Sequence, residues 1–509
     1  MRAIGASRAC VITAAAWAVL AVGVELPAQR PSPPGTAGDE GLAPVLGRPT
    51  DRSVTLSLLP PADLDVQVEY GATAAALDRR TPRSSVKGGE PVEILLDGLQ
   101  PDTRYYYRVR TGRPGEKGVR DGETRTFHTQ RAPAHPFTFA LQGDSHPERA
   151  GRMFDEELYR RTLERVARDQ PDFYLLMGDD FSIDPLIARG QLTQRNVDDV
   201  YLRQRRFLAA VGQSAPLFLV NGNHEQAARH LLKGTSDSAP LLAGRARNRF
   251  FPLPAPDAFY GGNAQPVEGI GFLRDYYAWT WGDALFVVID PYWHSPVQVD
   301  SAPGGGGGGN RAAGQGGRRR TERPQGQGGG GRERDWWGIS IGDAQYQWLK
   351  KTLEESRARY KFMFAHHVMG TGRGGVEQAD LYEWGGRDPS GQSAFAARRP
   401  GWELPIHQLM VKTGVTIFFQ GHDHLFARQE KDGVIYQEVP NPADATYTAF
   451  NQEAYRSGDR LPNSGYLRVR VAADRATVEY VRMFLPRDEQ PADRVSGTVH
   501  STYAVPPRR

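Results

Sequence analysis

The chain has 509 residues, which is too long for one ordinary domain, so two or three domains are expected. Its single cysteine, Cys10, lies in an N-terminal segment that is expected to be removed. The mature chain would then have no cysteine, which excludes a disulfide framework, thiol catalysis and cysteine-based metal sites. The formal net charge of +4 does not identify a polyanion-binding protein, because residues 303–334 (net +5) and 1–28 (net +1) leave the remainder near −2.

Residues 1–28 resemble a secretory signal peptide. Arg2 and Arg8 form a positive end, Val11–Val24 is an apolar run too short for a membrane anchor, and "LPAQ" offers a cleavage point near Ala28. We therefore expect an exported protein, periplasmic or extracellular, with no stable membrane anchor after cleavage. Residues 29–40 are rich in Pro and Gly and are expected to form a flexible tether.

Residues 41–133 contain short runs of alternating apolar and polar residues separated by turn residues. The runs are "SVTLSLL", "DVQVEYG", "PVEILLDGL", "RYYYRVR" and "TRTFHTQ". This pattern predicts a small antiparallel β-sandwich. The segment "LDGLQPDTRYYYRVR" resembles the fibronectin type III signature, with Leu99, Pro101, Thr103, Tyr105 and Tyr107 at the usual spacing, and the module is expected to be structural.

Residues 135–486 have a different pattern. The apolar runs "FTFALQ", "DFYLLM", "PLFLVN", "ALFVVID", "KFMFAHH" and "VTIFFQ" alternate with helical stretches, among them residues 154–170 and 343–360. Continuous apolar strands indicate a sheet covered on both faces, as in layered α/β proteins.

Two further segments are expected to lie outside this core. Residues 303–334 contain 14 Gly and seven Arg, and they predict a disordered insertion, with an anionic partner for the arginines as the alternative. Residues 487–509 contain few apolar residues and are expected to form a tail that runs loosely over the surface.

Five polar motifs each follow one of the apolar runs. They are "GDSH" (143–146), "GDD" (178–180), "GNHE" (222–225), "HH" (366–367) and "GHDH" (421–424). If their strands share one sheet, all five loops open onto the same edge, where α/β proteins bind ligands. The glycines before Asp144, Asp179, Asn223 and His422 are expected to allow a sharp turn before each polar residue.

The residue types in these motifs suit a pair of metal ions. Imidazole and carboxylate groups bind Zn, Fe, Mn or Co, and one carboxylate can bridge two ions. Two ions roughly 3.5–4 Å apart can hold a phosphate and lower the pKa of a bound water. Taken singly, "GDD" is typical of a turn and "HH" of core or surface histidines, but the joint occurrence favours a metal site.

In this order the motifs resemble the calcineurin-like metallophosphoesterase superfamily. "DAQYQWLKKTL" and the preceding fibronectin-like region resemble its purple acid phosphatase branch. The resemblance implies a fibronectin III-like antiparallel β-sandwich followed by a four-layer α/β/β/α metallophosphoesterase domain. It also implies two divalent or trivalent metal ions (Fe, Zn or Mn). The first would be bound by Asp144, His146 and His424, the second by Asn223, His366 and His422, and Asp179 would bridge them.

The resemblance also assigns roles to the neighbouring residues. His366 rather than His367 aligns with the family's His-x-Pro pattern, although Val368 replaces the proline. His224 is the implied general acid, or a hydrogen-bond donor to the leaving oxygen. Glu225 is expected to orient local structure.

Two positions depart from the purple acid phosphatase pattern. That branch has a metal-binding Tyr three residues after the bridging Asp, where this chain has Ser182, and it lacks a counterpart of His146. We therefore expect a colourless site of the general superfamily type.

The favoured hypothesis is an exported phosphoesterase that hydrolyses small phosphate monoesters, with a metal-bound hydroxide attacking in line and His224 assisting departure of the alcohol. A phosphodiesterase acting on nucleotides or phospholipid head groups is the first alternative, because both reactions use the same metal core. The second alternative is a non-catalytic surface or polyanion-binding protein with a vestigial site. No specific nucleic-acid partner is expected.

Overall fold

The computed structural model describes residues 41–299, 335–368 and 372–508. The expected signal peptide (1–28), tether (29–40) and insertion (303–334) therefore lie outside the described residues. Within the described ranges, no helix has both the length and the apolar character needed to cross a membrane.

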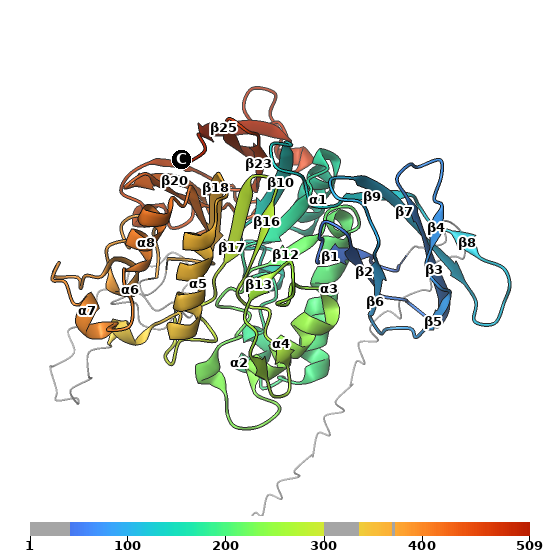
Figure 1. The fold of residues 1–509 in the computed structure, drawn as a ribbon, viewed down its shortest axis with the longest axis horizontal. Helices are drawn as coiled ribbons and strands as arrows, with labels where there is room; N and C mark the ends of the chain where they lie inside the picture. The colour runs from blue at the N-terminus through green and yellow to red at the C-terminus, as the bar shows by residue number, and fades with distance from the viewer. Residues whose placement is uncertain (1–40, 300–334, 369–371, 509) are drawn as a thin grey trace, which may run out of the picture. The chain divides into compact units, whose positions relative to one another are not determined.

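The N-terminal region consists of antiparallel sheets (Figure 1, blue). One sheet has the order β1-β2-β6, and the other has the order β4-β3-β7-β8 with β5 added to β3 and β9 to β7. The strands are β1 (Val45–Gly47), β2 (Val54–Leu58), β3 (Leu64–Gly71), β4 (Arg79–Arg80), β5 (Ser84–Val86), β6 (Val92–Leu96), β7 (Arg104–Gly112), β8 (Arg120–Asp121) and β9 (Arg125–His128).

The alternating sequence of β7 explains its place in this region. Tyr105, Tyr107 and Val109 are buried, while the residues between them are partly exposed. The Tyr105 hydroxyl accepts a hydrogen bond from the backbone N–H of Gln100 at 2.9 Å, which fixes the turn that precedes the strand. The predicted antiparallel N-terminal region is thus confirmed.

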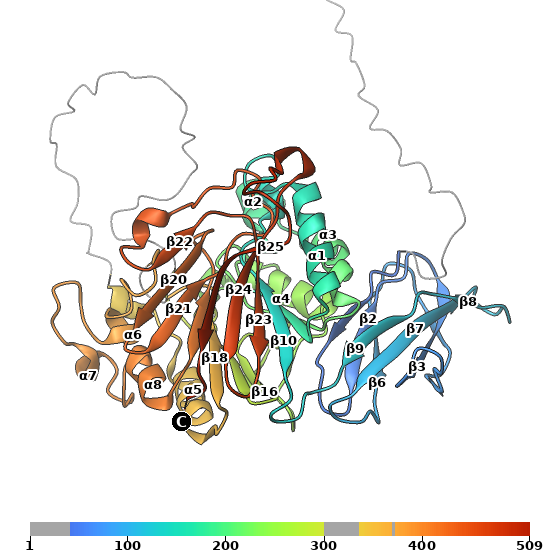
Figure 2. The same cartoon turned by 90° about the horizontal axis from the view of Figure 1, so that it is seen from above.

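Two larger sheets lie at the centre of the remaining chain (Figure 2). The six-stranded sheet has the order β12-β11-β10-β23-β24-β25, and the eight-stranded sheet has the order β13-β16-β17-β18-β19-β21-β20-β22. The six-stranded sheet comprises β10 (Phe137–Gln142), β11 (Phe173–Leu176), β12 (Leu217–Leu219), β23 (Gly465–Val471), β24 (Ala476–Arg482) and β25 (Thr498–Val505). The eight-stranded sheet comprises β13 (Gly261–Gly262), β16 (Tyr277–Trp281), β17 (Ala284–Val288), β18 (Tyr360–Phe364), β19 (Ile417–Gln420), β20 (Phe426–Lys431), β21 (Val434–Glu438) and β22 (Asp459–Leu461). A small separate pair is formed by β14 (Pro266–Val267) and β15 (Gly271–Phe272).

Aromatic side chains join the two large sheets face to face. Phe139 of β10 lies edge-on to Phe286 of β17 with ring centroids 5.2 Å apart, and Phe218 of β12 stacks on Trp279 of β16 at 4.0 Å. Such pairs contribute about 0.5–1.5 kcal/mol each beyond the area they bury. The apolar runs of the sequence therefore become the core between two sheets.

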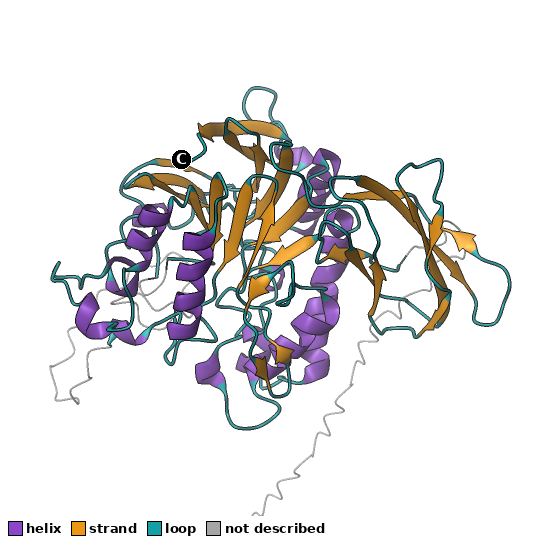
Figure 3. Ribbon diagram, viewed as in Figure 1, coloured by secondary structure: helices purple, strands orange, loops and turns teal. Residues whose placement is uncertain are grey.

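Helices cover the outer faces of both sheets (Figure 3). Residues of α1, α3 and α4 pack on the six-stranded sheet, and residues of α5, α6 and α8 pack on the eight-stranded sheet. The helices are α1 (Glu156–Asp169), α2 (Asp184–Ala188), α3 (Gln194–Gly212), α4 (Ala239–Phe250), α5 (Asp343–Glu355), α6 (Tyr382–Gly385), α7 (Phe395–Arg398) and α8 (Ile406–Thr413). The start of α1 is set by Asp155, whose side chain accepts a hydrogen bond from the Leu158 N–H.

The C-terminal segment corrects the expected tail at 487–509. Thr498–Val505 forms β25, which pairs antiparallel with β24 at the edge of the six-stranded sheet. Val505 is buried, and the Tyr503 hydroxyl donates to Gln437 Oε1 at 2.9 Å. An edge strand buries few of its side chains, so the low apolar content that suggested a loose tail is compatible with a strand.

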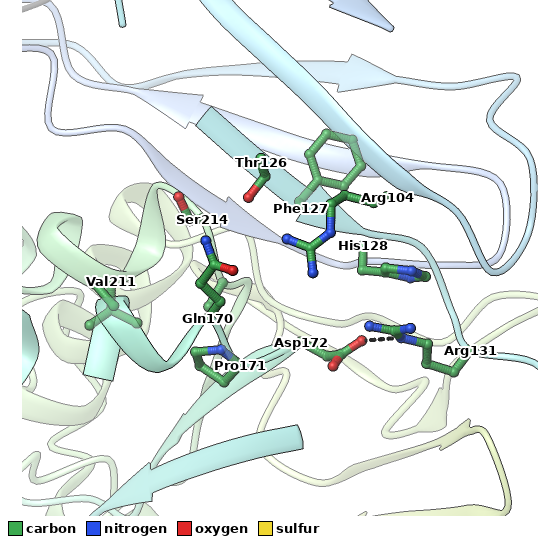
Figure 4. Close-up of a pocket in the computed structure, with 12 residues that line it drawn as sticks. Arg104, Thr126, Phe127, His128, Arg131, Gln170, Pro171, Asp172, Val211 and Ser214 are labelled. Atoms are coloured by element: carbon green, nitrogen blue, oxygen red, sulfur yellow. Dashed lines mark hydrogen bonds and ion pairs between the residues drawn. The ribbon is translucent and has the colours of Figure 1, made fainter. Parts of the chain in front are cut away.

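The N-terminal sheets are attached to α3 by buried polar contacts. Arg205 of α3 is fully buried and donates to Ser57 O at 2.8 Å and to Ala43 O at 3.1 Å. A narrow cleft lies along the same junction, where Arg131 and Asp172 form an ion pair at 2.6 Å (Figure 4). Its volume is about 20 Å³, enough for about one water, and none of the expected metal ligands lines it.

Candidate metal centre

The five polar motifs follow strands of two different sheets. "GDSH", "GDD" and "GNHE" follow the parallel strands β10, β11 and β12, whereas "HH" and "GHDH" follow the parallel strands β18 and β19. The expectation that the five loops open from one shared sheet is therefore wrong. The loops still meet, because the aromatic core holds the two sheets face to face.

One group of side chains brings together Asp144, His146 and His424. Asp144 Oδ2 lies 2.9 Å from His424 Nε2 and 3.6 Å from His146 Nε2, and all three side chains are buried. The two imidazole Nε2 atoms are 3.1 Å apart. One carboxylate oxygen and two ring nitrogens therefore converge on one point.

A second group lies beside the first. Asp179 Oδ2 is 3.2 Å from His366 Nε2, which is in turn 3.1 Å from Asn223 Oδ1 and 3.3 Å from His422 Nδ1. The Asp179 carboxylate also faces the first group, with Oδ2 3.7 Å from His146 Nε2. All seven residues expected to bind metal are thus brought together, with Asp179 between the two groups.

His146 and His366 each form a hydrogen bond through Nδ1 that turns Nε2 toward the cluster. His146 Nδ1 is 2.8 Å from Glu148 Oε1, and His366 Nδ1 is 2.8 Å from the Met177 carbonyl oxygen. Because these oxygens accept, each Nδ1 carries a proton and each Nε2 is the nitrogen that faces the cluster and is available to a metal ion. Carboxylate and carbonyl partners of this kind are typical of metal-binding histidines.

The charges of the cluster also fit a metal ion. Burial opposes ionisation of Asp144 and Asp179, but the nearby imidazoles, His366 above all, hold both pKa values well below the usual range. Burial is the largest influence on His424 and lowers its pKa to about 4, so its ring is neutral. Burial also acts to lower the pKa of His366, but the carboxylates of Asp179 and Asp144 outweigh burial and hold that pKa well above the usual range, so this ring gives up a proton when it binds a metal ion. Ionised carboxylates and neutral imidazoles are the donors that Zn, Fe and Mn take.

Backbone strain is concentrated at the same residues. His146, Asp179, His422 and His424 have positive φ angles of 50°, 59°, 80° and 55°. A left-handed conformation costs a residue other than Gly about 1–3 kcal/mol, and such strain gathers at functional sites.

Most of the motif glycines allow close packing and do not make the expected sharp turns. Among the four, Gly178 has a positive φ, of 100°. Gly143, Gly222 and Gly421 are instead needed for close approach, since a Cβ on Gly421 would lie 2.7 Å from Asp144 Oδ1. The turns are made by the polar residues themselves.

Glu225 holds two of the motif loops together. Its carboxylate accepts hydrogen bonds from four backbone N–H groups, at distances of 2.7–3.0 Å, in the two loops after β11 and β12; the donors are Asp179, Asp180, Phe181 and Gly222. This arrangement agrees with the expectation that Glu225 orients local structure.

His224 lies at the rim of the cluster, with a quarter of its side chain exposed. Nε2 is 3.9 Å from Asp179 Oδ2, and Nδ1 is hydrogen-bonded to the Asp184 carboxylate. Burial lowers its pKa, but Asp179 and Asp184 outweigh burial and raise the pKa to about 9. Arg149 Nη2 lies 3.0 Å from His224 Nε2. A guanidinium only donates, so this contact is a hydrogen bond only when Nε2 is unprotonated, and it is repulsive to the protonated ring that the raised pKa favours.

Sequence reasoning missed Asp184 and Arg149. Asp184 begins the short helix α2 and Arg149 ends a 3-10 turn, both beyond the motifs, and neither stands at a spacing that has a meaning of its own. The available signal in the sequence is their closeness to a motif. Arg149 stands three residues after "GDSH", and Asp184 stands four residues after "GDD".

His367 is set apart from the cluster. Its Nδ1 is 3.0 Å from the Tyr292 hydroxyl, and its ring stacks on that of His422 with centroids 4.8 Å apart. Burial and the neighbouring His366 lower its pKa to about 3, so the ring is neutral. Of the two histidines in "HH", His366 is therefore the one that points at Asp179 and Asn223.

Known proteins share both the sequence pattern and the fold. Residues 137–426 match the family model described as Calcineurin-like phosphoesterase. A solved structure of PhoD aligns with a TM-score of 0.61 at 15% identity, covering 94% of this chain and 92% of that chain. Purple acid phosphatase PPD1 from yellow lupin (Lupinus luteus) seeds aligns with a TM-score of 0.55 at 15% identity, covering 91% and 74%. At these identities the two structures show the fold alone.

A curated relative matches over a short segment. An acid phosphatase of Aspergillus ficuum is 39% identical over 49 residues, which make up 10% of this chain and 7% of that protein. The family model, in contrast, spans more than half of the chain and contains every residue of the cluster. The chain therefore belongs to the calcineurin-like phosphoesterase family, whose members are metal-dependent phosphoric ester hydrolases.

Proposed function

We propose that the protein is an exported, dinuclear-metal phosphoesterase that hydrolyses small phosphate monoesters. The observation that carries this proposal is the position of Asp179, whose Oδ2 lies 3.2 Å from His366 Nε2 in one group and 3.7 Å from His146 Nε2 in the other. A carboxylate placed between two sets of donors is suited to bridge two ions.

The expected ligands divide between two ions. Asp144, His146 and His424 would hold the first, and Asn223, His366 and His422 the second, with Asp179 shared. Iron, zinc or manganese suits these donors. Ions at this site supply Lewis acidity toward phosphoryl oxygens and lower the pKa of bound water. Ser182 leaves no tyrosinate to colour such a centre.

The protein's own groups handle the leaving oxygen and the phosphoryl charge. His224 presents Nε2 at the rim, where it donates a proton to the departing alcohol, while Asp184 fixes the ring through Nδ1. Arg149 is partly exposed beside His224 and is placed to bind a phosphoryl oxygen.

The finer architecture and the location of the protein belong to the same proposal. The antiparallel sheets of residues 41–133 and the Tyr105 contact support a fibronectin III-like module, and helices packed on both large sheets support a four-layer α/β/β/α domain. The charged and apolar parts of residues 1–28 support export to the periplasm or the medium.

Metal analysis and paired substrates test the proposal. We expect about two metal ions per chain and a higher kcat/KM on p-nitrophenyl phosphate than on bis-p-nitrophenyl phosphate. Faster turnover of the diester would replace the monoesterase by the phosphodiesterase alternative. A metal-free protein that turns over neither would support a non-catalytic surface or polyanion-binding role.

A further inference from the structure

A large aromatic side chain is exposed beside the cluster. Phe450 is 44% exposed, and its ring stacks on that of His424 with centroids 5.9 Å apart and planes 27° from parallel. Single exposed apolar residues are ordinary on protein surfaces. Phe450 differs because part of its ring contacts a buried histidine of the cluster while the rest faces solvent.

The loop that carries Phe450 is fixed to the motif that carries His424. Asn451 Nδ2 donates to the Asp423 carbonyl oxygen at 3.3 Å, and Asn463 Nδ2 donates to the His424 carbonyl oxygen at 2.6 Å. The Tyr455 hydroxyl donates to Asp423 Oδ2 at 2.8 Å. Three side chains that follow Phe450 in the chain thus fix its loop relative to the cluster.

Phe450 contacts the half of the cluster that also contacts His224. The His146 ring is 4.9 Å from that of His424 and 5.1 Å from that of His224, the group proposed to protonate the leaving oxygen. With the phosphoryl group at the cluster, the alcohol portion of the substrate must extend past this rim. The exposed part of Phe450 is then available to that portion and not to the phosphate.

We propose that Phe450 is a specificity-determining residue that stacks on a planar aromatic ring in the alcohol portion of the substrate. The inference rests on the proposed phosphoesterase function and narrows its substrates to aryl or nucleoside monophosphates. Offset or edge contacts between aromatic rings favour such substrates over aliphatic phosphates, and a stack on a single side chain changes binding by about tenfold.

Two substrate pairs separate ring recognition from the reaction itself. Adenosine 5′-monophosphate and ribose 5-phosphate share the scissile bond and differ in the base, and phenyl phosphate and ethyl phosphate form the aryl pair. For Phe450→Ala we expect kcat/KM to fall about tenfold on one or both ring-bearing substrates and to change less than about twofold on the aliphatic partners. A loss confined to phenyl phosphate identifies an aryl substrate, and a loss on the nucleotide identifies a nucleoside substrate.

Further variants control for the loss of bulk. Phe450→Tyr keeps the aromatic face and is expected to retain wild-type selectivity, whereas Phe450→Leu keeps apolar bulk and is expected to lose it. Phe272→Ala removes a comparably exposed ring in β15, outside the cluster, and should leave every ratio unchanged. Metal content and thermal unfolding of each variant check that the fold is intact.

The outcomes distinguish this inference from the proposed function. If wild type turns over all four substrates and Phe450→Ala affects them equally or not at all, the assignment of Phe450 is overturned while the phosphoesterase stands. Wild type with bound metal but no turnover of any of the four overturns both.

Discussion

His146 and His424 face each other across the cluster with 3.1 Å between their Nε2 atoms. His146 Nδ1 is already committed to Glu148, so its Nε2 is the nitrogen that faces the neutral ring of His424. Nitrogens this close need a proton or a cation between them, and His424 Nε2 also lies 2.9 Å from Asp144 Oδ2. The two imidazoles and the carboxylate converge as the ligands of one metal ion would, and several expectations depend on this arrangement.

Removal of metal should destabilise the folded protein. Chelation leaves Asp144, Asp179 and the converging imidazoles buried without a bound cation, and a ligand at 100 times its dissociation constant contributes about 2.7 kcal/mol. We expect a lower thermal midpoint after dialysis against EDTA, restored by zinc, manganese or iron. An identical midpoint with and without metal, measured by scanning calorimetry, would argue against a buried cation site.

His224→Ala should lose rate but keep metal. The side chain lies at the rim and is absent from the expected ligand set, so metal content should stay at the wild-type value. General acid catalysis contributes about 10²- to 10⁴-fold, and kcat on an alkyl phosphate should fall by that order. The effect should be smaller for p-nitrophenyl phosphate, whose leaving group needs little protonation; equal losses on both substrates would contradict a proton-donating role.

Asp184→Asn tests the residue that positions His224. The amide keeps the shape of the side chain but loses the charge that orients Nδ1. We expect kcat to fall roughly 10- to 100-fold with KM and metal content nearly unchanged, and we expect little further loss when the change is added to His224→Ala. Fully additive losses in the double variant would show that Asp184 acts independently of His224.

Much of this fold could be predicted from the chain because its patterns were local. The run "FYLL" of β11 places Phe173 and Leu175 in the core between the sheets and Tyr174 and Leu176 under the helices, so every residue is apolar. Residues 154–170 likewise show helical spacing and form α1. Each expected metal ligand stands within four residues of the end of a strand, in a short motif that the sequence alone reveals.

Other features depend on contacts between distant segments. Nothing within β10 or β18 indicates that the two strands belong to different sheets. Their sheets differ because β10 pairs with β23 and β18 pairs with β17, which lie elsewhere in the chain. Asp184 and Phe450 lie in a short helix and an irregular loop, and their roles arise from proximity to His224 and His424. Composition alone also misjudged Thr498–Val505, because an edge strand needs few apolar residues.

Deletion of residues 498–509 tests the correction at the C-terminus. Loss of β25 exposes the edge of β24 and removes the Tyr503 contact with Gln437. We expect a clearly lower thermal midpoint and a greater tendency to aggregate. Deletion of residues 506–509 alone is the control and should cost much less; equal midpoints for wild type and the longer deletion would restore the description as a loose tail.

Arg205→Met should weaken the attachment of the N-terminal sheets to α3. The change leaves the buried carbonyl oxygens of Ser57 and Ala43 without their donor, at a cost of about 1–3 kcal/mol for each buried polar group. The readout is a lower thermal midpoint together with faster proteolysis near residue 133. Arg206→Met, the adjacent exposed position on the same helix, should change neither.

The central claim is that Asp179 bridges two metal ions at one phosphoesterase site, and Asp179→Asn tests it most directly. The amide keeps the size of the side chain but cannot supply a bridging charge. Metal content by mass spectrometry and kcat/KM on p-nitrophenyl phosphate should be measured on the same samples. We expect about two ions per chain in the active wild type, and loss of both metal and activity in the variant. Two ions and wild-type turnover in Asp179→Asn would contradict the account.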